Sequence, residues 1–321
     1  MSIGLVTKKN LLILVSIIIT FVVIQALRSF DIITSYYEIT IATVCINVIL
    51  ATSLNLITGF TGQFSLGHAG FMSIGAYTCG IILISNPTTV GFITGLLAGG
   101  FAATIVGILI GIPTLRLKGD YLAIATLGMA EIIKVIFLNL EITNGAAGLA
   151  GIPRFANWGW LFFFAVISVV VINNFLKSSQ GRACIAIRED EIAAESMGVN
   201  STKYKIMAFA LGAFFAGIAG GLYAAYFYFL RPTIFGFMKS VDILVMVVLG
   251  GLGSLTGSVI AATLLTVIST YLQQFTAVRM ILYALILVVL MIFRPKGIMG
   301  TMEISDLVKN IGRRRRRGKV E

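Results

Sequence analysis

Charged residues are scarce in this chain, and their scarcity argues against most soluble folds. Only 12% of the 321 residues are Asp, Glu, Lys or Arg, whereas soluble domains carry about 25%. Hydrophobic residues make up 58% of the chain, and no long polar stretch interrupts them before the C-terminal tail. The composition therefore predicts an integral membrane protein.

Residues that bind metals or perform covalent chemistry are equally few. The chain has one histidine, His68, and three cysteines, none of them in a CxxC pair. This argues against a zinc site, an iron–sulfur site and a disulfide framework. The sequence also contains no G-x-x-x-x-G-K-[ST] phosphate loop, no HExxH and no cluster of aspartates. We therefore expect a protein that is not an enzyme and that binds no cofactor or metal itself.

The chain does contain a series of apolar runs, most of them near the 20 or so residues that a helix needs to cross a bilayer. They predict ten helices, at about 11–28, 39–58, 65–85, 92–115, 119–140, 159–176, 206–230, 240–254, 257–274 and 279–294. The eighth run is short and glycine-rich, so a full crossing, a re-entrant element and a half-helix are all open. The expected fold is all-α, with about ten transmembrane helices within residues 1–300 and a basic tail over 301–321.

Lysine and arginine are distributed unevenly about these helices. With the N-terminus inside, the inner side holds most of them, including those of loop 177–205 and the run Arg313 to Arg317. Cytoplasmic loops carry the excess of basic residues in membrane proteins, so both termini are expected to be cytoplasmic. The net charge of +11 then indicates contact with anionic lipid rather than nucleic acid. For the arginine run itself, lipid attraction and a solvated tail are equally open.

Two glycine-rich stretches, Gly59–Gly70 and Gly250–Ser258, join apolar runs in similar ways. Interrupted helices at corresponding places in two halves often mark a transporter's substrate site, particularly where the halves are inverted repeats. The candidate pathway residues are the polar or small residues in these stretches and inside the predicted helices: Gln63, Ser65, His68, Thr126, Glu131, Asp242, Gly253 and Ser254.

Several of these residues have a structural alternative. Glu131 and Lys134 are three residues apart, so they share a helix face and are expected to pair. The pair serves either the pathway or helix packing. His68 likewise either binds substrate or forms a hydrogen bond between helices. Asp242 begins the eighth run and has an interfacial position as its alternative.

Loop 177–205 is the longest polar segment between the predicted helices. It reads KSSQGRACIAIREDEIAAESMGVNSTKYK, and a single helix is expected from Arg182 to Met197, ended by Gly198. Ile185, Ile192 and Met197 give this helix an apolar side, opposite a charged side. On the inner membrane face it either docks in a groove of a partner protein or is a solvated connector.

The loop's GRACIAIREDEIAAESMGV and the following YKIMAFALGAFFAGIAGGLYA resemble the permease subunits of ABC importers for branched-chain amino acids, in particular the LivM-type subunit. Further stretches resemble the same family: LNLITGFTGQFSLGHAGFMSIGAY (54–77), GDYLAIATLGMAEI (119–132), MVVLGGLGSLTGSVIAA (246–262) and FRPKGIMG (293–300). The resemblance covers about residues 40–300 and leaves out the first apolar run and the arginine-rich tail.

The resemblance implies that loop 177–205 holds a coupling helix seated in a cleft of an ATPase subunit. The implied coupling residues are Arg182, Arg188, Glu189, Asp190, Glu191, Ala193, Ala194, Glu195 and Gly198. It also implies ATP-driven import of Leu, Ile and Val by alternating access across a bacterial or archaeal plasma membrane.

The partners implied by the resemblance are a LivH-type paralogous permease, two cytoplasmic ABC ATPases that use ATP and Mg, and an extracytoplasmic amino-acid-binding protein. A second copy of this chain is the alternative to the paralogue. Urea, amides or other amino acids are alternative substrates, and an ion-coupled secondary transporter is the alternative mechanism.

Overall fold

The computed structural model describes residues 8–30, 34–115, 117, 119–275, 281, 285, 288, 292 and 297–300 of the chain. These residues form helices and connections, and the one β-bridge among them joins Leu149 to Leu230. The all-helical class predicted from the sequence is therefore confirmed for the described residues.

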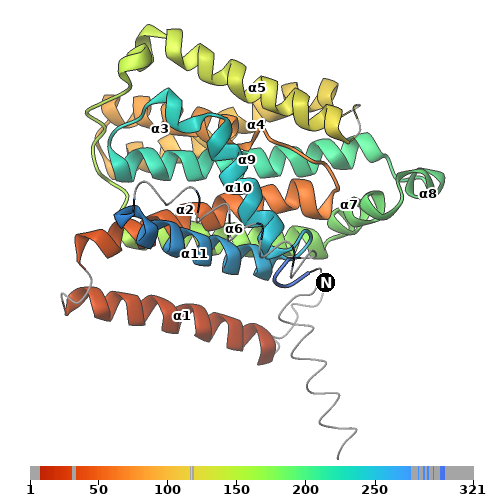
Figure 1. The fold of residues 1–321 in the computed structure, drawn as a ribbon, viewed down its shortest axis with the longest axis horizontal. Coiled ribbons are helices and arrows are strands. Elements are labelled where there is room, and N and C mark those ends of the chain that lie inside the picture. Colours follow the sequence, from red (N-terminus) through yellow and green to blue (C-terminus); the bar gives the residue numbers. More distant parts are fainter. Residues whose placement is uncertain are drawn as a thin grey trace, which may run out of the picture.

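Helices follow one another along the chain with mostly short connections (Figure 1). They are α1 (Lys8–Ser29), α2 (Ser35–Asn55) with the π-helical turn η1 (Leu56–Phe60), α3 (His68–Ser85), α4 (Thr89–Thr114), α5 (Asp120–Asn139), α6 (Trp158–Lys177), α7 (Ser179–Glu189), α8 (Glu191–Ser196), α9 (Ser201–Phe227), α10 (Phe237–Gly250) and α11 (Leu255–Tyr271). Short 3₁₀ turns lie at η2 (Glu141–Thr143), η3 (Gly145–Ala147), η4 (Pro232–Phe235) and η5 (Leu272–Gln274).

Within the described part of the chain, six helices are long and apolar enough to cross a membrane: α2 with η1, α3, α4, α5, α6 and α9. The first nine predicted runs each correspond to a helix, but α10 and α11 have only 14 and 17 residues. The expected count of about ten crossings is therefore not confirmed. Most of the tenth predicted run, 279–294, and the whole tail 301–321 lie outside the described residues.

Helices α3, α4 and α9 form the centre of the bundle, and glycines bring their backbones into contact. A Cβ built on Gly220 of α9 would lie 1.9 Å from the backbone oxygen of Met72 in α3. One built on Gly75 would lie 2.0 Å from the oxygen of Gly217, and one on Gly99 would lie 2.8 Å from the oxygen of Gly75. Small residues allow such close packing where helices cross in a membrane protein. We call these contacts the glycine seam.

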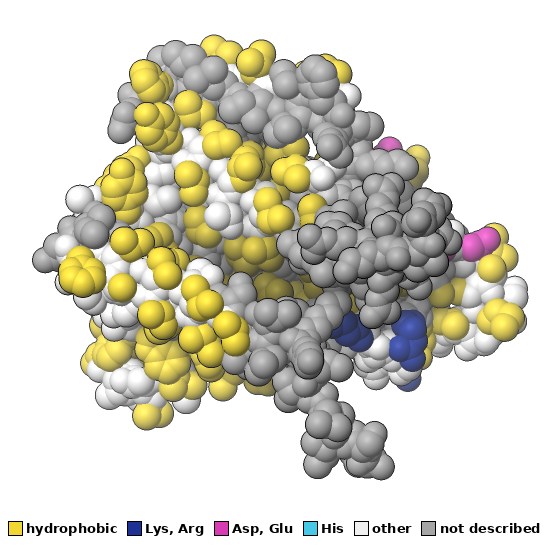
Figure 2. Space-filling model, turned by 90° about the horizontal axis from the view of Figure 1, so that it is seen from below, with side chains coloured by type: hydrophobic (Ala, Val, Ile, Leu, Met, Phe, Trp, Pro, Cys, Tyr) yellow, Lys and Arg dark blue, Asp and Glu magenta, His cyan; other side chains and the backbone are white. Residues whose placement is uncertain are grey.

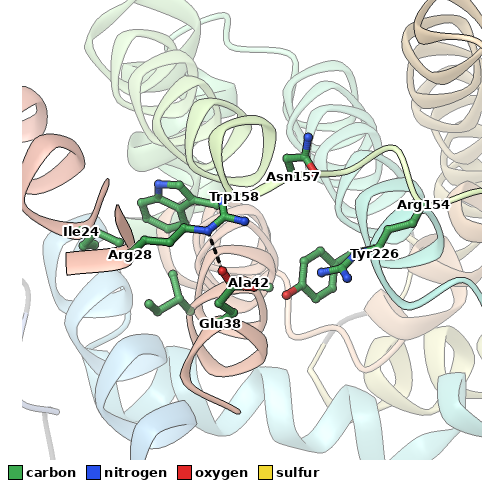
Figure 3. A pocket seen from close by; sticks show the side chains of 9 residues that line it. Ile24, Arg28, Glu38, Ala42, Arg154, Asn157, Trp158 and Tyr226 are labelled. Carbon is green, nitrogen blue, oxygen red and sulfur yellow. Dashed lines mark hydrogen bonds and ion pairs between the residues drawn. The ribbon is translucent and has the colours of Figure 1, made fainter. Parts of the chain in front are cut away.

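The bundle has two distinct ends (Figure 1). Helices α7 and α8 project from one, which we call the α7 end. At the opposite end, Arg28 of α1 forms a 2.5 Å ion pair with Glu38 of α2, and the guanidinium of Arg154 lies 4.7 Å above the ring of Tyr226 (Figure 3). Hydrophobic side chains cover much of the flank seen in Figure 2, while the lysines and arginines drawn there gather toward the α7 end.

Helix α10 starts partway along the length of the bundle. After α9 the chain passes through η4, and the backbone N–H of Phe237 then donates to Oε1 of Glu131 at 3.0 Å. Glu131 is eleven residues into α5, or roughly 16 Å along its axis at 1.5 Å per residue. From there α10 runs to the α7 end, where the turn at Gly251 leads into α11. The eighth apolar run is therefore a helix of 14 residues that begins beside the middle of α5 and ends at the α7 end.

Loop 177–205 contains two helices where one was predicted. Asp190 interrupts the helix with an extended backbone, φ −156° and ψ 109°, and its Oδ1 accepts from the N–H groups of Ile192 and Ala193. The residue acts as the N-cap of α8, and it is the one residue between the end of α7 and the start of α8. The predicted end is confirmed, because Gly198 follows α8 with the left-handed φ of +83°.

Candidate functional site

Helix α7 lies against the bundle through one face. Ser178 caps its start by accepting from the N–H of Gly181 at 3.2 Å, and a Cβ on Gly181 would lie 2.4 Å from the Cα of Leu176. Cys184 and Ile187 are buried under the helix. This close packing means that α7 cannot shift without disturbing the helices beneath it.

Helix α8 presents apolar side chains away from the bundle. Ile192 is 75% exposed and Met197 is 85% exposed. The predicted apolar side is thus divided, because Ile185 packs against the core while these two side chains project outward. These two large apolar side chains are thus uncovered on an otherwise polar loop.

The residues implied for ATPase coupling divide in the same way. Those that face outward are Arg182, Glu189, Asp190, Ala193, Glu195 and Gly198. Three others turn toward the protein. Ala194 is buried, Glu191 forms a 2.5 Å ion pair with Lys205 of α9, and Arg188 reaches into the bundle. Glu195 is exposed but still accepts from the hydroxyl of Ser201, which also ties α8 to α9.

The two glycine-rich stretches meet at the α7 end, and Asn55 joins them. Its Nδ2 donates to the oxygen of Ser254 at 2.9 Å and to the hydroxyl of Ser258 at 2.7 Å. Its Oδ1 accepts from the N–H of Gly253 at 3.0 Å. Arg188 completes the junction by donating from Nη1 to the oxygen of Gly59 at 2.8 Å. We call Asn55, Gly59 and the turn from Gly251 to Ser254 the glycine junction.

A cavity of about 260 Å³ lies beside this junction. Its wall combines apolar side chains from the α4–α5 region, such as Leu115 and Leu122, with Ile187 of α7. Charged residues of loop 177–205, Lys205 among them, complete it. Gln63 also lines the cavity, and its buried side-chain amide has no hydrogen-bond partner in the described parts of the chain. Gln63, one of the predicted pathway residues, therefore lines a cavity in the bundle.

Ser65, His68 and Thr126 gather where α3 begins, again inside the bundle. The hydroxyl of Thr126 accepts from the N–H of Leu66 at 3.1 Å, and Ser65 accepts from the N–H of Gly67 at 3.3 Å. Nε2 of His68 lies 2.8 Å from the hydroxyl of Ser53 in α2, so the hydrogen bond between helices, one of its two alternatives, is present. Nδ1 of His68 is buried and without a partner among the residues described.

The starts of α3 and α10 lie side by side. The N–H of Ala69 donates to the hydroxyl of Ser240 at 3.3 Å, which joins the first turns of the two helices. Glu131 of α5 accepts from the N–H of Phe237 at the start of α10. It also forms a 2.6 Å ion pair with Lys134, so the predicted pairing is confirmed. The side chains of this pair are 36% and 24% exposed on the flank of α5. Asp242, further along α10, is exposed.

The structure therefore groups the predicted pathway residues at two levels. Gln63, Gly253 and Ser254 lie near the glycine junction, while Ser65, His68, Thr126 and Glu131 lie deeper, around the starts of α3 and α10. Sequence reasoning missed Asn47 and Asn55. Asn47 donates to Thr266 at 2.9 Å and accepts from Nζ of Lys239 at 3.2 Å. The sequence signal that could have found both residues was a side-chain amide within an apolar run.

Cys184 gives a direct test of how α7 is seated. Its burial raises the pKa of the thiol to about 11, so at pH 7 the reactive thiolate is almost absent. With Cys45 and Cys79 replaced by serine, we expect Cys184 to react with a maleimide at least tenfold more slowly than a cysteine placed by Met197→Cys, measured by mass spectrometry. Equal rates would contradict this seating.

Comparison with known proteins is consistent with these features. Residues 36–293 match the family model described as the permease component of the branched-chain amino acid transport system. The chain is 38% identical over 289 residues to the high-affinity branched-chain amino acid transport system permease protein LivM of Salmonella typhimurium. This match covers 79% of this chain and 68% of that protein. With LivM of Escherichia coli the identity is 37% over 300 residues, 83% of this chain and 70% of that protein.

A weaker similarity extends to a second kind of permease. LivH of Escherichia coli, a permease protein of the same high-affinity system, is 26% identical over 294 residues, 81% of this chain and 92% of that protein. No solved structure matches the chain significantly.

Proposed function

The chain belongs to the family of branched-chain amino acid transport permeases, and on that premise we propose that it is the LivM-type permease of an ATP-driven importer for Leu, Ile and Val. It pairs with a LivH-type permease, is driven by two ATPase subunits and receives substrate from an extracytoplasmic binding protein. Both termini and the α7 end lie in the cytoplasm of a bacterial or archaeal cell.

The observation that carries this proposal is the projecting tip of α8. Ile192 and Met197 are exposed there, on the side that the distribution of Lys and Arg assigns to the cytoplasm. The sequence contains no phosphate-binding loop of its own. A docking surface on the side where ATP is present, in a chain without an ATP site, fits a permease driven by a separate ATPase that uses ATP and Mg.

The flank of α5 supports a paired permease. A partly exposed ion pair well inside a membrane span is costly against lipid, and such groups usually face protein or a water-filled path. Glu131 and Lys134 therefore face the partner permease across the translocation path. One negative and one positive group at this level suit the two ends of an amino acid zwitterion, and Ser65, His68 and Thr126 lie along the same path.

The test is reconstitution of the permease in proteoliposomes. Radiolabelled leucine uptake is expected only when the paired permease, both ATPases, the binding protein and ATP are all present. Uptake by this chain alone, driven by a sodium or proton gradient, would overturn the proposal in favour of a secondary transporter. Screening the binding protein with leucine, urea and short amides decides the substrate.

Glu131→Gln tests the path. The amide still accepts from the N–H of Phe237, but Lys134 loses its counter-charge, so we expect leucine uptake to fall about tenfold with normal amounts of protein in the membrane. A loss of one strong charge interaction, about 1.4 kcal/mol, corresponds to this factor. Glu141→Gln, at an exposed site in the α5–α6 connection, is the control. Unchanged uptake in Glu131→Gln would remove Glu131 from the path.

A further inference from the structure

Arg188 lies on the coupling loop, but its side chain points into the protein. The side chain is only 26% exposed, and Nη1 donates to the backbone oxygen of Gly59 at 2.8 Å. Glu189 holds the other side of the guanidinium and is itself exposed. Of the charged residues on α7, Arg188 is thus connected both to the outer surface of the loop and to the end of a membrane-spanning helix.

The guanidinium lies between the two glycine-rich stretches and contacts both. A Cβ built on Gly253 would lie 2.6 Å from Nη1 of Arg188, and one built on Gly62 would lie 3.1 Å from its Cγ. Gly62 and Gly253 have φ of +73° and +89°, a conformation that favours glycine. Each stretch thus has a glycine beside the Arg188 side chain, and any larger residue at either position would crowd that side chain.

Gly59 is also at a weak point of its helix. It lies in η1, a π-helical turn, and such turns interrupt the regular hydrogen bonding of an α-helix. Asn55, one turn earlier, is bonded to the Gly253–Ser258 region through both atoms of its amide. A displacement applied at Gly59 therefore passes to the second stretch through Asn55 as well as through Arg188.

Two other links between the coupling loop and the bundle lead elsewhere. Glu191 pairs with Lys205, and Glu195 accepts from Ser201, so both connect α8 to the first residues of α9. Helix α9 belongs to the central unit that the glycine seam holds together. The hydrogen bond from Arg188 to Gly59 instead reaches the interrupted helices. Cys184, on the buried face of the same helix, also bonds Thr61 of the first stretch.

We propose that Arg188 is a positioning residue that transmits movement of α7 to both glycine-rich stretches. This inference rests on the proposed function. It names the part of the coupling path that lies within the permease, from α7 to the glycine junction. When the ATPases move the loop, Arg188 pulls on Gly59, and the glycine junction moves with it. The start of α3 at His68 lies six residues beyond Gly62, and α10 ends at the junction. The change therefore reaches the level of Glu131 from both stretches.

The test uses the complete transporter with Arg188→Gln and Arg188→Lys. Leucine transported per ATP hydrolysed is expected to fall at least tenfold in Arg188→Gln, because the shorter neutral side chain cannot reach Gly59. Arg188→Lys keeps a charged donor and is expected to recover part of the ratio. ATPase subunits should co-purify and hydrolyse ATP in both. Lys203→Gln, an exposed position at the start of α9, controls for loss of a positive charge and should match the wild type.

Two cysteine reporters separate transmission from general destabilisation. With the native Cys45 and Cys79 replaced by serine, Cys184 reports on α7, and Leu252→Cys, in the same background with Cys184 also replaced, reports on the glycine junction. In the otherwise wild-type transporter, ATP should change maleimide labelling at both positions. In Arg188→Gln the change at Cys184 should persist and the change at position 252 should be lost.

A wild-type transport ratio in Arg188→Gln, or an ATP-dependent change at position 252 that survives the substitution, would overturn the inference. If Arg188→Gln fails to assemble, Arg188→Met, which also lacks the donor to Gly59, carries both measurements under the same criteria. Absence of ATP-dependent uptake by the wild-type complex would instead refute the proposed function, so the two failures are distinguishable.

Discussion

Replacing Ile192 and Met197 together by glutamate is expected to abolish ATP-driven leucine uptake while leaving the permease folded. Both side chains are mostly exposed at the tip of α8, so the change removes no packing within the chain. In the transporter they would enter an apolar groove of the ATPase, and each contributes about 1.5–3 kcal/mol when buried. The loss of both lowers ATPase affinity by more than about 100-fold.

The measurements are co-purification of the ATPase subunits and uptake in proteoliposomes. The matched control replaces the same two residues by leucine, which keeps the apolar surface and should retain both binding and uptake. Normal ATPase binding in the glutamate variant would show that the tip of α8 is not the docking surface, and the solvated connector would then be the better interpretation of the loop.

Gly220→Ala is expected to have the largest effect on stability. The new methyl group would lie 1.9 Å from the backbone oxygen of Met72, and neither backbone can move without separating α3 from α9. Overpacking of this kind costs typically 1–3 kcal/mol and sometimes more, so we expect a loss of about 3 kcal/mol, seen as a lower unfolding temperature in detergent and less folded protein in gel filtration.

Gly128→Ala in α5 is the matched control, because its expected effect on stability has the opposite sign. No atom lies within 4 Å of the built Cβ at Gly128, and alanine is favoured over glycine within a helix by about 1 kcal/mol. This variant should be as stable as the wild type or slightly more so. If Gly220→Ala unfolded at the same temperature as Gly128→Ala, the close contact in the glycine seam would be wrong.

The apolar pattern predicted the helices well because burial in a membrane bundle leaves a strong local signal. The pairing of Glu131 with Lys134 was equally accessible, since it depends on a spacing of three residues within one helix. The single helix predicted for the loop was wrong because its composition favours helix throughout. There, the capping of Ile192 and Ala193 by Asp190 outweighs propensity, and this choice depends on how the loop is anchored at both ends.

Contacts between distant segments were not predictable. Asn55 and Ser254 are 199 residues apart, and nothing local indicates that one amide joins the two glycine-rich stretches. The resemblance places Arg188 among the residues that couple to the ATPase, and the sequence did not indicate that its long side chain crosses from α7 to Gly59. A helical pattern gives the side of a helix on which a residue lies, and a flexible side chain at the edge of that side can turn either way.

The glycine seam also limits how this permease can change shape. Side chains between two helices act as a deformable layer that lets them slide, but α3, α4 and α9 touch through their backbones and have no such layer at Gly75, Gly217 and Gly220. Low compressibility and lack of slip make these three helices a fixed frame. Opening on either side of the membrane must then come from the less buried elements around it, above all α5 and the short helix α10.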